Sequence, residues 1–267
     1  MRTLTVARTR VESLRGHAAM LVFSILVAAS FSLGVRAANL IDPAAISAAR
    51  LAIAAGIVAG LALAGPGLSP RVFAAPWRYG VVGGLFAAYF VLMFEGLKTA
   101  PAVSASAVFT LTPVMSAVFG WWLMRQRTTP RMAAALALGG VGALWVIFGG
   151  DLAAMARLEL GRGETIYLIG CAAHALYTPM VRRLNRGEGA LSFAFGTLAA
   201  AALILLVWGG PAIRDTDWLH LPMIVWVTLV YIAVFATAGT TVLLQFAALR
   251  LPSAKVMAYT YLTPVWV

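Results

Sequence analysis

The stretch PAVSASAVFTLTPV at residues 101–114 returns near the end of the chain as PSAKVMAYTYLTPV at residues 252–265. The two segments align without gaps, share six of fourteen residues and both end in LTPV. Upstream, FEGLK at 94–98 matches FAALR at 246–250 once one residue of offset is allowed. Self-similarity over a long interval indicates that the chain contains two related halves.

The composition places both halves in a membrane. The 267 residues are 62% hydrophobic and 11% charged, whereas a soluble domain has roughly 25% charged residues. Apolar runs recur that are long enough to cross the roughly 30 Å hydrocarbon core. These runs lie at 18–37, 43–64, 79–97, 102–124, 132–149, 165–183, 190–209 and 224–249, and a ninth begins at 253. Each is predicted to be a helix, because a bilayer offers the backbone no hydrogen-bond partners.

The number of spans decides how the two halves are related. Five spans fall in the first half, and an odd number makes the second half begin on the opposite side of the membrane. We therefore expect an all-α membrane helix bundle of two inverted five-helix repeats, residues 1–150 and 151–267. A complete second repeat would continue past Val267. The expectation is a ten-span protein from which the rest of span nine and span ten are missing.

The basic residues predict the orientation, because positively charged loops stay in the cytoplasm. With the N-terminus inside, the cytoplasmic segments hold thirteen arginines: Arg2, Arg8, Arg10, Arg15, Arg71, Arg78, Arg125, Arg127, Arg131, Arg182, Arg183, Arg186 and Arg250. The outer segments hold five basic residues, Arg36, Lys98, Arg157, Arg162 and Arg214, and most of the acids, Asp42, Asp151, Glu159, Glu164, Asp215 and Asp217. The net charge of +11 thus indicates membrane anchoring, and no nucleic-acid partner is expected.

Several segments in a fixed order resemble a known family. The repeated LTPV segments, the tract WWLMRQRTTPRMAAALALGGVGALWVIFGG at 121–150 and CAAHALYTPMVRRL at 171–184 resemble the EamA-type permeases of the drug/metabolite transporter superfamily. The resemblance implies a ten-helix fold with a central cavity, in an inner or plasma membrane, that usually exports amino acids, other metabolites or drugs. One departure is Arg125-Gln126-Arg127, where the family often carries a Glu after the fourth span.

Ionisable side chains inside spans are candidate site residues, because each costs roughly 2.5 to 3.5 kcal/mol on insertion. Arg50 points away from a ridge of small residues on span two and would meet an anionic group, or it would only bond helix-end carbonyls. Glu95 would line the cavity and bind a cation or proton, or form an interfacial pair with Lys98. His174, close to Tyr177, would couple transport to protons, or serve only in packing. Lys255 is expected to reach the interface.

Two prolines give the strongest positional signal. Pro113 and Pro264 occupy equivalent sites in spans four and nine, and each frees a backbone carbonyl one turn earlier while bending the helix. Matched helix interruptions in two halves point to a transporter's binding site. The substrate site is therefore predicted near Thr112, Pro113, Thr263 and Pro264, with Tyr259 and Tyr261 as aromatic walls. Alternatively, the paired prolines only shape the bundle.

The motifs of other function classes are missing from the sequence. The histidines His17, His174 and His220 are far apart without an HExxH arrangement, and neither a G-x-S-x-G nor a P-loop occurs. We therefore expect no metal, no cofactor and no enzyme activity, but a secondary transporter that moves a small molecule, as an exporter, by alternating access. Its partners would be the solute, the bilayer and a proton, in a monomer or homodimer. A membrane-embedded enzyme and a sensory or structural membrane protein remain the alternatives.

Overall fold

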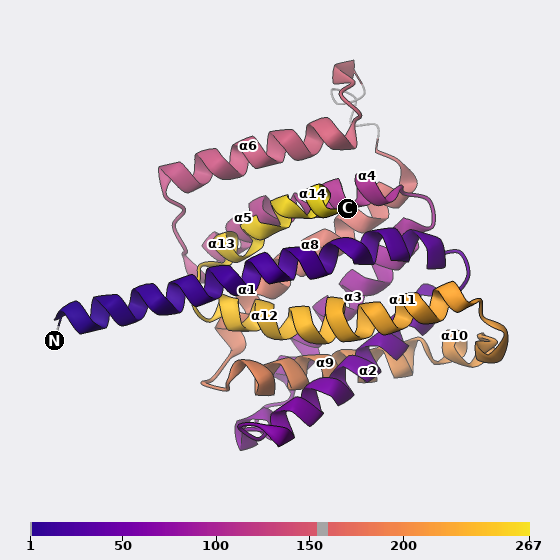
Figure 1. Cartoon of the computed structure of the whole chain (residues 1–267), viewed down its shortest axis with the longest axis horizontal. Coiled ribbons are helices and arrows are strands. Elements are labelled where there is room, and N and C mark those ends of the chain that lie inside the picture. Colours follow the sequence, from indigo (N-terminus) through magenta and orange to yellow (C-terminus); the bar gives the residue numbers. More distant parts are fainter. Residues whose placement is uncertain (1, 154–159) are drawn as a thin grey trace.

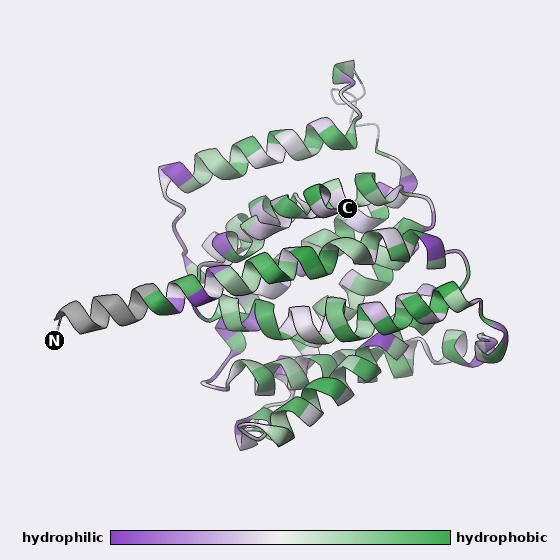
Figure 2. Ribbon diagram, in the orientation of Figure 1, coloured by the Kyte–Doolittle hydropathy of each residue, from purple (hydrophilic) through white to green (hydrophobic). Residues whose placement is uncertain are grey.

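The computed structural model describes residues 2–153 and 160–267, and within these ranges every regular element is helical. Arg157 and Glu159, used above for the orientation, lie outside the described residues, as do the side chains of Arg2, Arg8 and Arg10. The helices run side by side along one direction (Figure 1). Apolar residues cover their lengths, while hydrophilic residues gather toward the two ends of the bundle (Figure 2). The predicted all-α membrane bundle is confirmed.

The first half begins with α1 (Arg2–Ala37), whose N-terminal part extends beyond the bundle (Figure 1). Asp42 caps the next helix, because its side chain accepts hydrogen bonds from the backbone N–H groups of Ala44 and Ala45. The other elements of this half are α2 (Pro43–Ala64), the short η1 (Pro70–Phe73), α3 (Trp77–Leu97), α4 (Ala102–Phe109), α5 (Thr112–Met124) and α6 (Pro130–Ile147).

The second half contains α8 (Arg162–Leu184), α9 (Ala190–Trp208), α10 (Gly210–Asp215), η2 (Trp218–His220), α11 (Met223–Ala233), the π-helical η3 (Val234–Gly239), α12 (Thr240–Ala248), α13 (Ser253–Met257), η4 (Ala258–Leu262) and α14 (Thr263–Trp266). Seven helices of the described residues are long and apolar enough to cross a membrane, by length and composition. The predicted spans at 165–183 and from 253 are not among them. The first carries polar side chains in its middle, and the second is divided into three short segments.

The spans predicted at 102–124 and from 253, each with a proline that bends its helix, are interrupted at matching places. In each repeat a new helical segment begins at the Thr-Pro of LTPV, Thr112 in α5 and Thr263 in α14. Pro113 cannot donate to the carbonyl of Phe109, one turn earlier. The hydroxyl of Thr112 donates to that carbonyl instead, at 2.7 Å. The predicted effect of the prolines on these helices is thus visible in the backbone.

The two halves are packed together through several helices. α3 lies against α8 and α9, α1 lies against α11 and α12, and α2 packs on α9 and α11. α13 contacts α5 and α14 contacts α4, so the two interrupted helices run antiparallel (Figure 1). α6 lies along one side and buries little of its surface. The core is therefore formed between the halves.

Candidate functional site

A small cavity of about 20 Å³, enough for about one water molecule, lies at the centre of the bundle. Its lining comes from both halves: α1, α2, α3 and α4 on one side, and α8, η3 and α12 on the other. All fifteen lining residues are buried, so neither end of the bundle gives solvent access to the cavity in this conformation. This volume is far below that of small-molecule sites, about 300 to 1,000 Å³, so the cavity has no room for an organic solute in this conformation.

Arg50 supplies the charge in this cavity. It projects from α2, is 1% exposed, and donates from Nε to the hydroxyl of Thr237 at 2.9 Å. Its guanidinium carbon lies 3.7 Å from the ring centroid of Phe90, a cation–π contact that partly offsets the loss of water. The Nη1 atom of Arg50 has no hydrogen-bond partner among the described residues. An arginine stays protonated in a protein, so this donor is available to an anionic ligand.

Aromatic side chains make up half of the other lining residues. The ring of His174 lies 4.4 Å from that of Tyr89 and 5.8 Å from that of Tyr177, at interplanar angles of 25° and 13°. Phe86 stacks on Tyr177 at 4.8 Å and 19°. Neither nitrogen of His174 has a hydrogen-bond partner among the described residues. These nearly parallel rings stack on one another and form a compact aromatic cluster beside the arginine.

Of the predicted site residues, the structure brings Arg50, His174 and Tyr177 together at the cavity. It does not bring Glu95 there. The Glu95 carboxylate pairs with Lys98 at 2.7 Å near the end of α3, and both side chains are partly exposed. Tyr259 also lies elsewhere, with its hydroxyl 3.0 Å from Nδ1 of His17. An end-of-helix position with a nearby opposite charge explains why Glu95 stays at the interface.

The predicted residues of the interrupted helices lie next to the cavity but do not line it. Thr112 and Thr260 meet where the two helices cross, with their hydroxyl oxygens 3.3 Å apart. Pro264 and Tyr261 face α6, where the Tyr261 ring occupies the space a side chain at Gly139 would need. From these two helices only Phe109 reaches the cavity. Pro113 and Thr263 are buried within the crossing.

Sequence reasoning missed the hydroxyl-rich segment that faces Arg50. Thr237 lies in the π-helical turn η3, and Thr240 and Thr241 follow it at the start of α12. Single π-helical turns inside helices are often found at functional sites. The signal was present as TAGTT, residues 237–241, a polar cluster within an apolar span.

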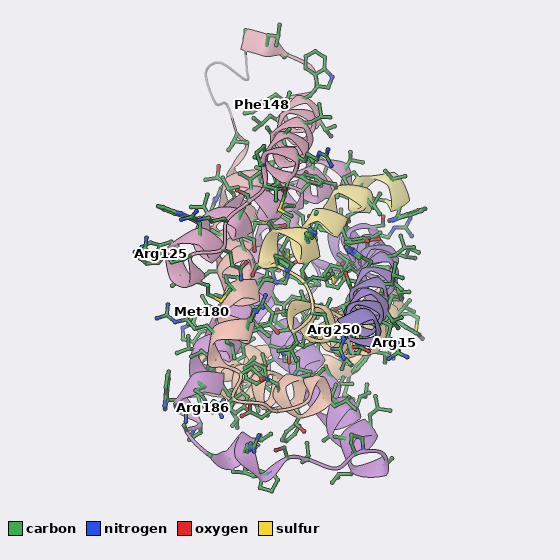
Figure 3. All side chains as sticks on the ribbon, turned by 90° about the vertical axis from the view of Figure 1, so that its left-hand side faces the viewer. Arg15, Arg125, Phe148, Met180, Arg186 and Arg250 are labelled. Carbon is green, nitrogen blue, oxygen red and sulfur yellow. The ribbon has the colours of Figure 1, made fainter. Side chains whose placement is uncertain are left out.

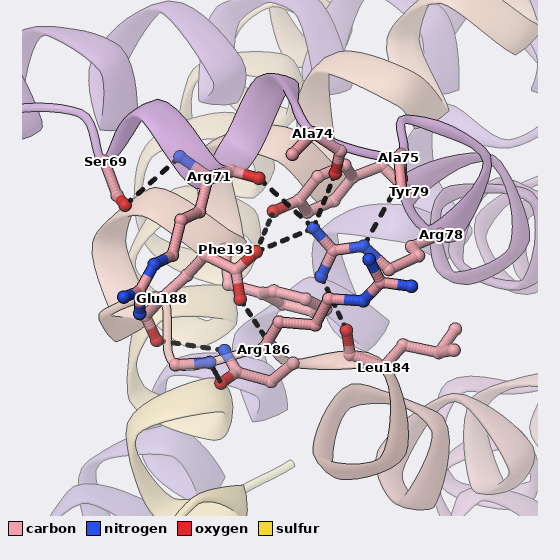
Figure 4. Close-up of polar contacts among 12 residues, drawn as sticks. Ser69, Arg71, Ala74, Ala75, Arg78, Tyr79, Leu184, Arg186, Glu188 and Phe193 are labelled. Atoms are coloured by element: carbon pink, nitrogen blue, oxygen red, sulfur yellow. Dashed lines mark hydrogen bonds and ion pairs between the residues drawn. The ribbon is translucent and has the colours of Figure 1, made fainter.

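A second buried arginine lies at one end of the bundle (Figure 4). Arg78, at the start of α3, donates from Nη2 to the Glu188 carboxylate at 2.7 Å and from Nη1 to the Leu184 carbonyl at 2.7 Å. It also donates to the carbonyls of Arg71, Ala74 and Ala75. The contact joins the loop before α3 to the loop between α8 and α9. We call this Arg78–Glu188 pair the latch.

The Glu188 carboxylate is held in its charged form. Burial raises the pKa of this group, but the hydrogen bonds from Arg78 and from the backbone N–H of Arg186, together with the arginine's charge, outweigh burial. The pKa therefore lies below its ordinary value of 4.5. Arg15, Arg125, Arg186 and Arg250 are found at the same end of the bundle, which faces the viewer in Figure 3.

A polar contact joins the loop after α5 to the second interrupted helix. The side-chain oxygen of Gln126 accepts a hydrogen bond from the backbone N–H of Ser253 at 3.2 Å. This contact satisfies a free donor at the start of α13. Gln126 therefore ties the loop after α5 to the second interrupted helix without a charge.

Comparison with known proteins gives consistent matches. The EamA-like transporter family matches residues 14–148 and 161–267. The uncharacterized transporter YyaM of Bacillus subtilis is 24% identical over 221 residues, which are 82% of this chain and 72% of that protein. The aromatic amino acid exporter YddG of Ancylobacter novellus is 36% identical over 134 residues, 49% of this chain and 44% of the exporter. A protein of known crystal structure superposes with a TM-score of 0.69 at 20% identity, over 96% of this chain and 85% of that one.

Proposed function

Because the chain belongs to the EamA-like transporter family and is a multi-pass membrane transporter, we propose that it exports a small organic solute by alternating access, with a solute site that opens at the small central cavity when the two halves move apart. The observation that carries this proposal is a small buried cavity lined by both halves, with an arginine donor at its wall that has no hydrogen-bond partner among the described residues. A site between two moving halves can open to either side in turn. The similarity to an exporter across 49% of the chain supports transport in the outward direction.

In this mechanism the two parts of the protein that move relative to one another are residues 1–150 and 151–267, which form inverted repeats. The antiparallel course of the two interrupted helices and their matching breaks support this division. Arg50, His174 and Tyr177 contact the solute in this mechanism. Thr112, Pro113, Thr263 and Pro264 form the crossing on which the helices turn, because interrupted helices have fewer backbone hydrogen bonds to distort.

The N-terminus faces the cytoplasm of a cell in whose inner or plasma membrane the protein lies. The gathering of arginines at the latch end supports this orientation (Figure 3). The latch is then the cytoplasmic gate, and it is closed in this conformation. The transporter acts as a monomer or homodimer.

Proton coupling would depend on His174. It is the titratable imidazole in the cavity lining, and its ring nitrogens are free to exchange a proton with a bound solute. Replacing His174 by Gln should then abolish the dependence of flux on a pH gradient while leaving potential-driven flux. An unchanged pH dependence would remove His174 from coupling.

A reversible cross-link at the latch end tests alternating access. The backbone N–H of Ser69, before η1, donates to the hydroxyl of Ser192 in α9 at 3.1 Å, so cysteines at both positions should fall within disulfide reach. In a Cys171→Ser background, the Ser69→Cys/Ser192→Cys protein is reconstituted into proteoliposomes loaded with radiolabelled aromatic amino acids and other solutes. Oxidation should stop efflux and a reductant should restore it. The single variant Ser69→Cys is the control.

Efflux that continues through the oxidised, fully cross-linked protein would contradict alternating access through this gate. Absence of protein-dependent efflux for every solute tested would contradict the transport proposal itself.

A further inference from the structure

We propose that, in the closed conformation, the central cavity binds a single halide ion, chloride, as the counter-ion of Arg50. This inference rests on the proposed function, because it assigns an occupant to the place at which the solute site opens. The cavity has about 20 Å³ of space, enough for about one water molecule. A chloride ion is only slightly larger than a water molecule, so it suits a site of this size.

The first argument is charge. Arg50 is 1% exposed and carries a full positive charge, because an arginine stays protonated in a protein. The lining residues include no Asp or Glu, and the carboxylates of Glu95 and Glu188 pair with Lys98 and Arg78 away from the cavity. A buried charge without a partner is costly, and the phenyl ring over the guanidinium offsets only part of that cost. A bound anion supplies the missing negative charge, whereas a water molecule does not.

The second argument is hydrogen bonding. Nη1 of Arg50, the hydroxyl of Thr241 and both ring nitrogens of His174 have no hydrogen-bond partner among the described residues, and all three residues line the cavity. The hydroxyls of Ser30 and Thr240, by contrast, donate to nearby backbone carbonyls. A neutral imidazole carries a proton on one of its nitrogens, so each of the three residues has one donor to offer. Donors of this kind, one of them cationic, suit a negatively charged acceptor.

The third argument is size. The rings of Phe86, Tyr89, His174 and Tyr177 stack on one another, so the aromatic wall is already packed. Sulfate and carboxylates contain several non-hydrogen atoms and exceed a space of about one water molecule. A monatomic anion fills the space without displacing a ring. The cavity is therefore expected to bind halides and to exclude polyatomic anions in this conformation.

Thermal unfolding at constant ionic strength tests the inference. Purified full-chain protein in sodium gluconate is titrated with sodium chloride, bromide or acetate, because a ligand that binds the folded state raises its Tm. Chloride and bromide should raise the Tm with saturation, and acetate should not. Arg50→Met should abolish the rise, and without chloride this variant should be at least as stable as the wild type. Arg50→Lys keeps the charge and should keep part of the rise.

The matched control is Lys255→Gln, which removes a cation from an exposed position outside the cavity and should keep the full rise. Anomalous diffraction from wild-type crystals grown in bromide locates the ion without any variant, and one peak beside Nη1 of Arg50 is expected. Absence of this peak would overturn the inference. It would also be overturned by a Tm that does not respond to halides, or by a response that persists in folded Arg50→Met.

Efflux of radiolabelled solutes from proteoliposomes separates the halide site from the transport proposal. Efflux by a protein that shows no halide binding would contradict the halide site alone. Halide binding without efflux of any solute would contradict transport alone.

Discussion

Arg78 and Arg50 are equally buried, at 1% exposure each, and their surroundings differ in nearly every respect. Arg78 donates to a carboxylate and to four backbone carbonyls. Arg50 donates to one threonine hydroxyl and lies over a phenyl ring, with Nη1 free. A guanidinium has five N–H donors. The comparison separates a buried arginine whose donors the protein satisfies, which stabilises the fold, from one with a donor unpartnered among the described residues, which is a candidate for binding a ligand.

The most direct test of the difference between Arg78 and Arg50 is to replace each arginine by methionine. Arg78→Met should destabilise the protein by about 3–5 kcal/mol, because it leaves the buried Glu188 carboxylate without its cation. Arg50→Met should leave stability unchanged or raise it, because it removes a buried charge that has no protein counter-ion. Unfolding of the detergent-purified variants measures both effects. A loss of equal size in the two variants would show that the arginines play the same role.

Acid should weaken the latch and spare the cavity. Because the pKa of Glu188 lies below its ordinary value of 4.5, the latch stabilises the folded state fully above that value and loses its contribution as the pH falls through the lower, folded-state pKa. The stability lost on acidification should not exceed the stability that the Arg78–Glu188 pair contributes at neutral pH. Thermal unfolding of the wild type and of Glu188→Gln is followed from neutral to acid pH. The difference between them should shrink below pH 4.5, and a constant difference would contradict the assignment.

Thr237→Val tests the hydrogen bond that Arg50 donates to the Thr237 hydroxyl, the one side-chain bond of Arg50 seen among the described residues. Losing a bond to a charged group should cost about 1.5–3 kcal/mol, because the variant keeps the shape of the side chain and removes its oxygen. In the Arg50→Met background the same substitution should cost much less, since the bond is already absent. Unfolding of the four proteins completes the cycle. Equal costs in both backgrounds would mean that Thr237 acts in packing rather than by holding the arginine.

The smallest effect is expected at the exposed ion pair. Glu95→Gln should change stability by about 0–1 kcal/mol, because Glu95 and Lys98 are partly exposed and water competes for both charges. High salt should reduce even this difference. Denaturation at low and high ionic strength measures it. A loss as large as that of the latch would place Glu95 in a buried network.

Much of the fold could be read from local sequence. Apolar runs predict membrane helices because the bilayer imposes the same condition on every segment, and the LTPV repeats locate the breaks because a proline acts on its own helix. The predicted positions differ most from the structure for the residues of the ninth predicted span, from 253, and for Glu95. Pro264, Tyr259 and Glu95 were placed by their position along a helix, but the face that each presents depends on which helices pack beside it.

The sequence by itself determined the membrane setting, the helical class, the two related halves and the candidate arginine in span two, since each follows from composition, periodicity or repetition along the chain. Three contacts depend on the packing of the helices. Arg50 donates a hydrogen bond to Thr237, His174 stacks among nearly parallel rings, and Arg78 and Glu188 form the latch. These contacts join residues far apart in sequence, across helices of both halves. Their partners are fixed by the packing of the whole bundle, which no local pattern contains.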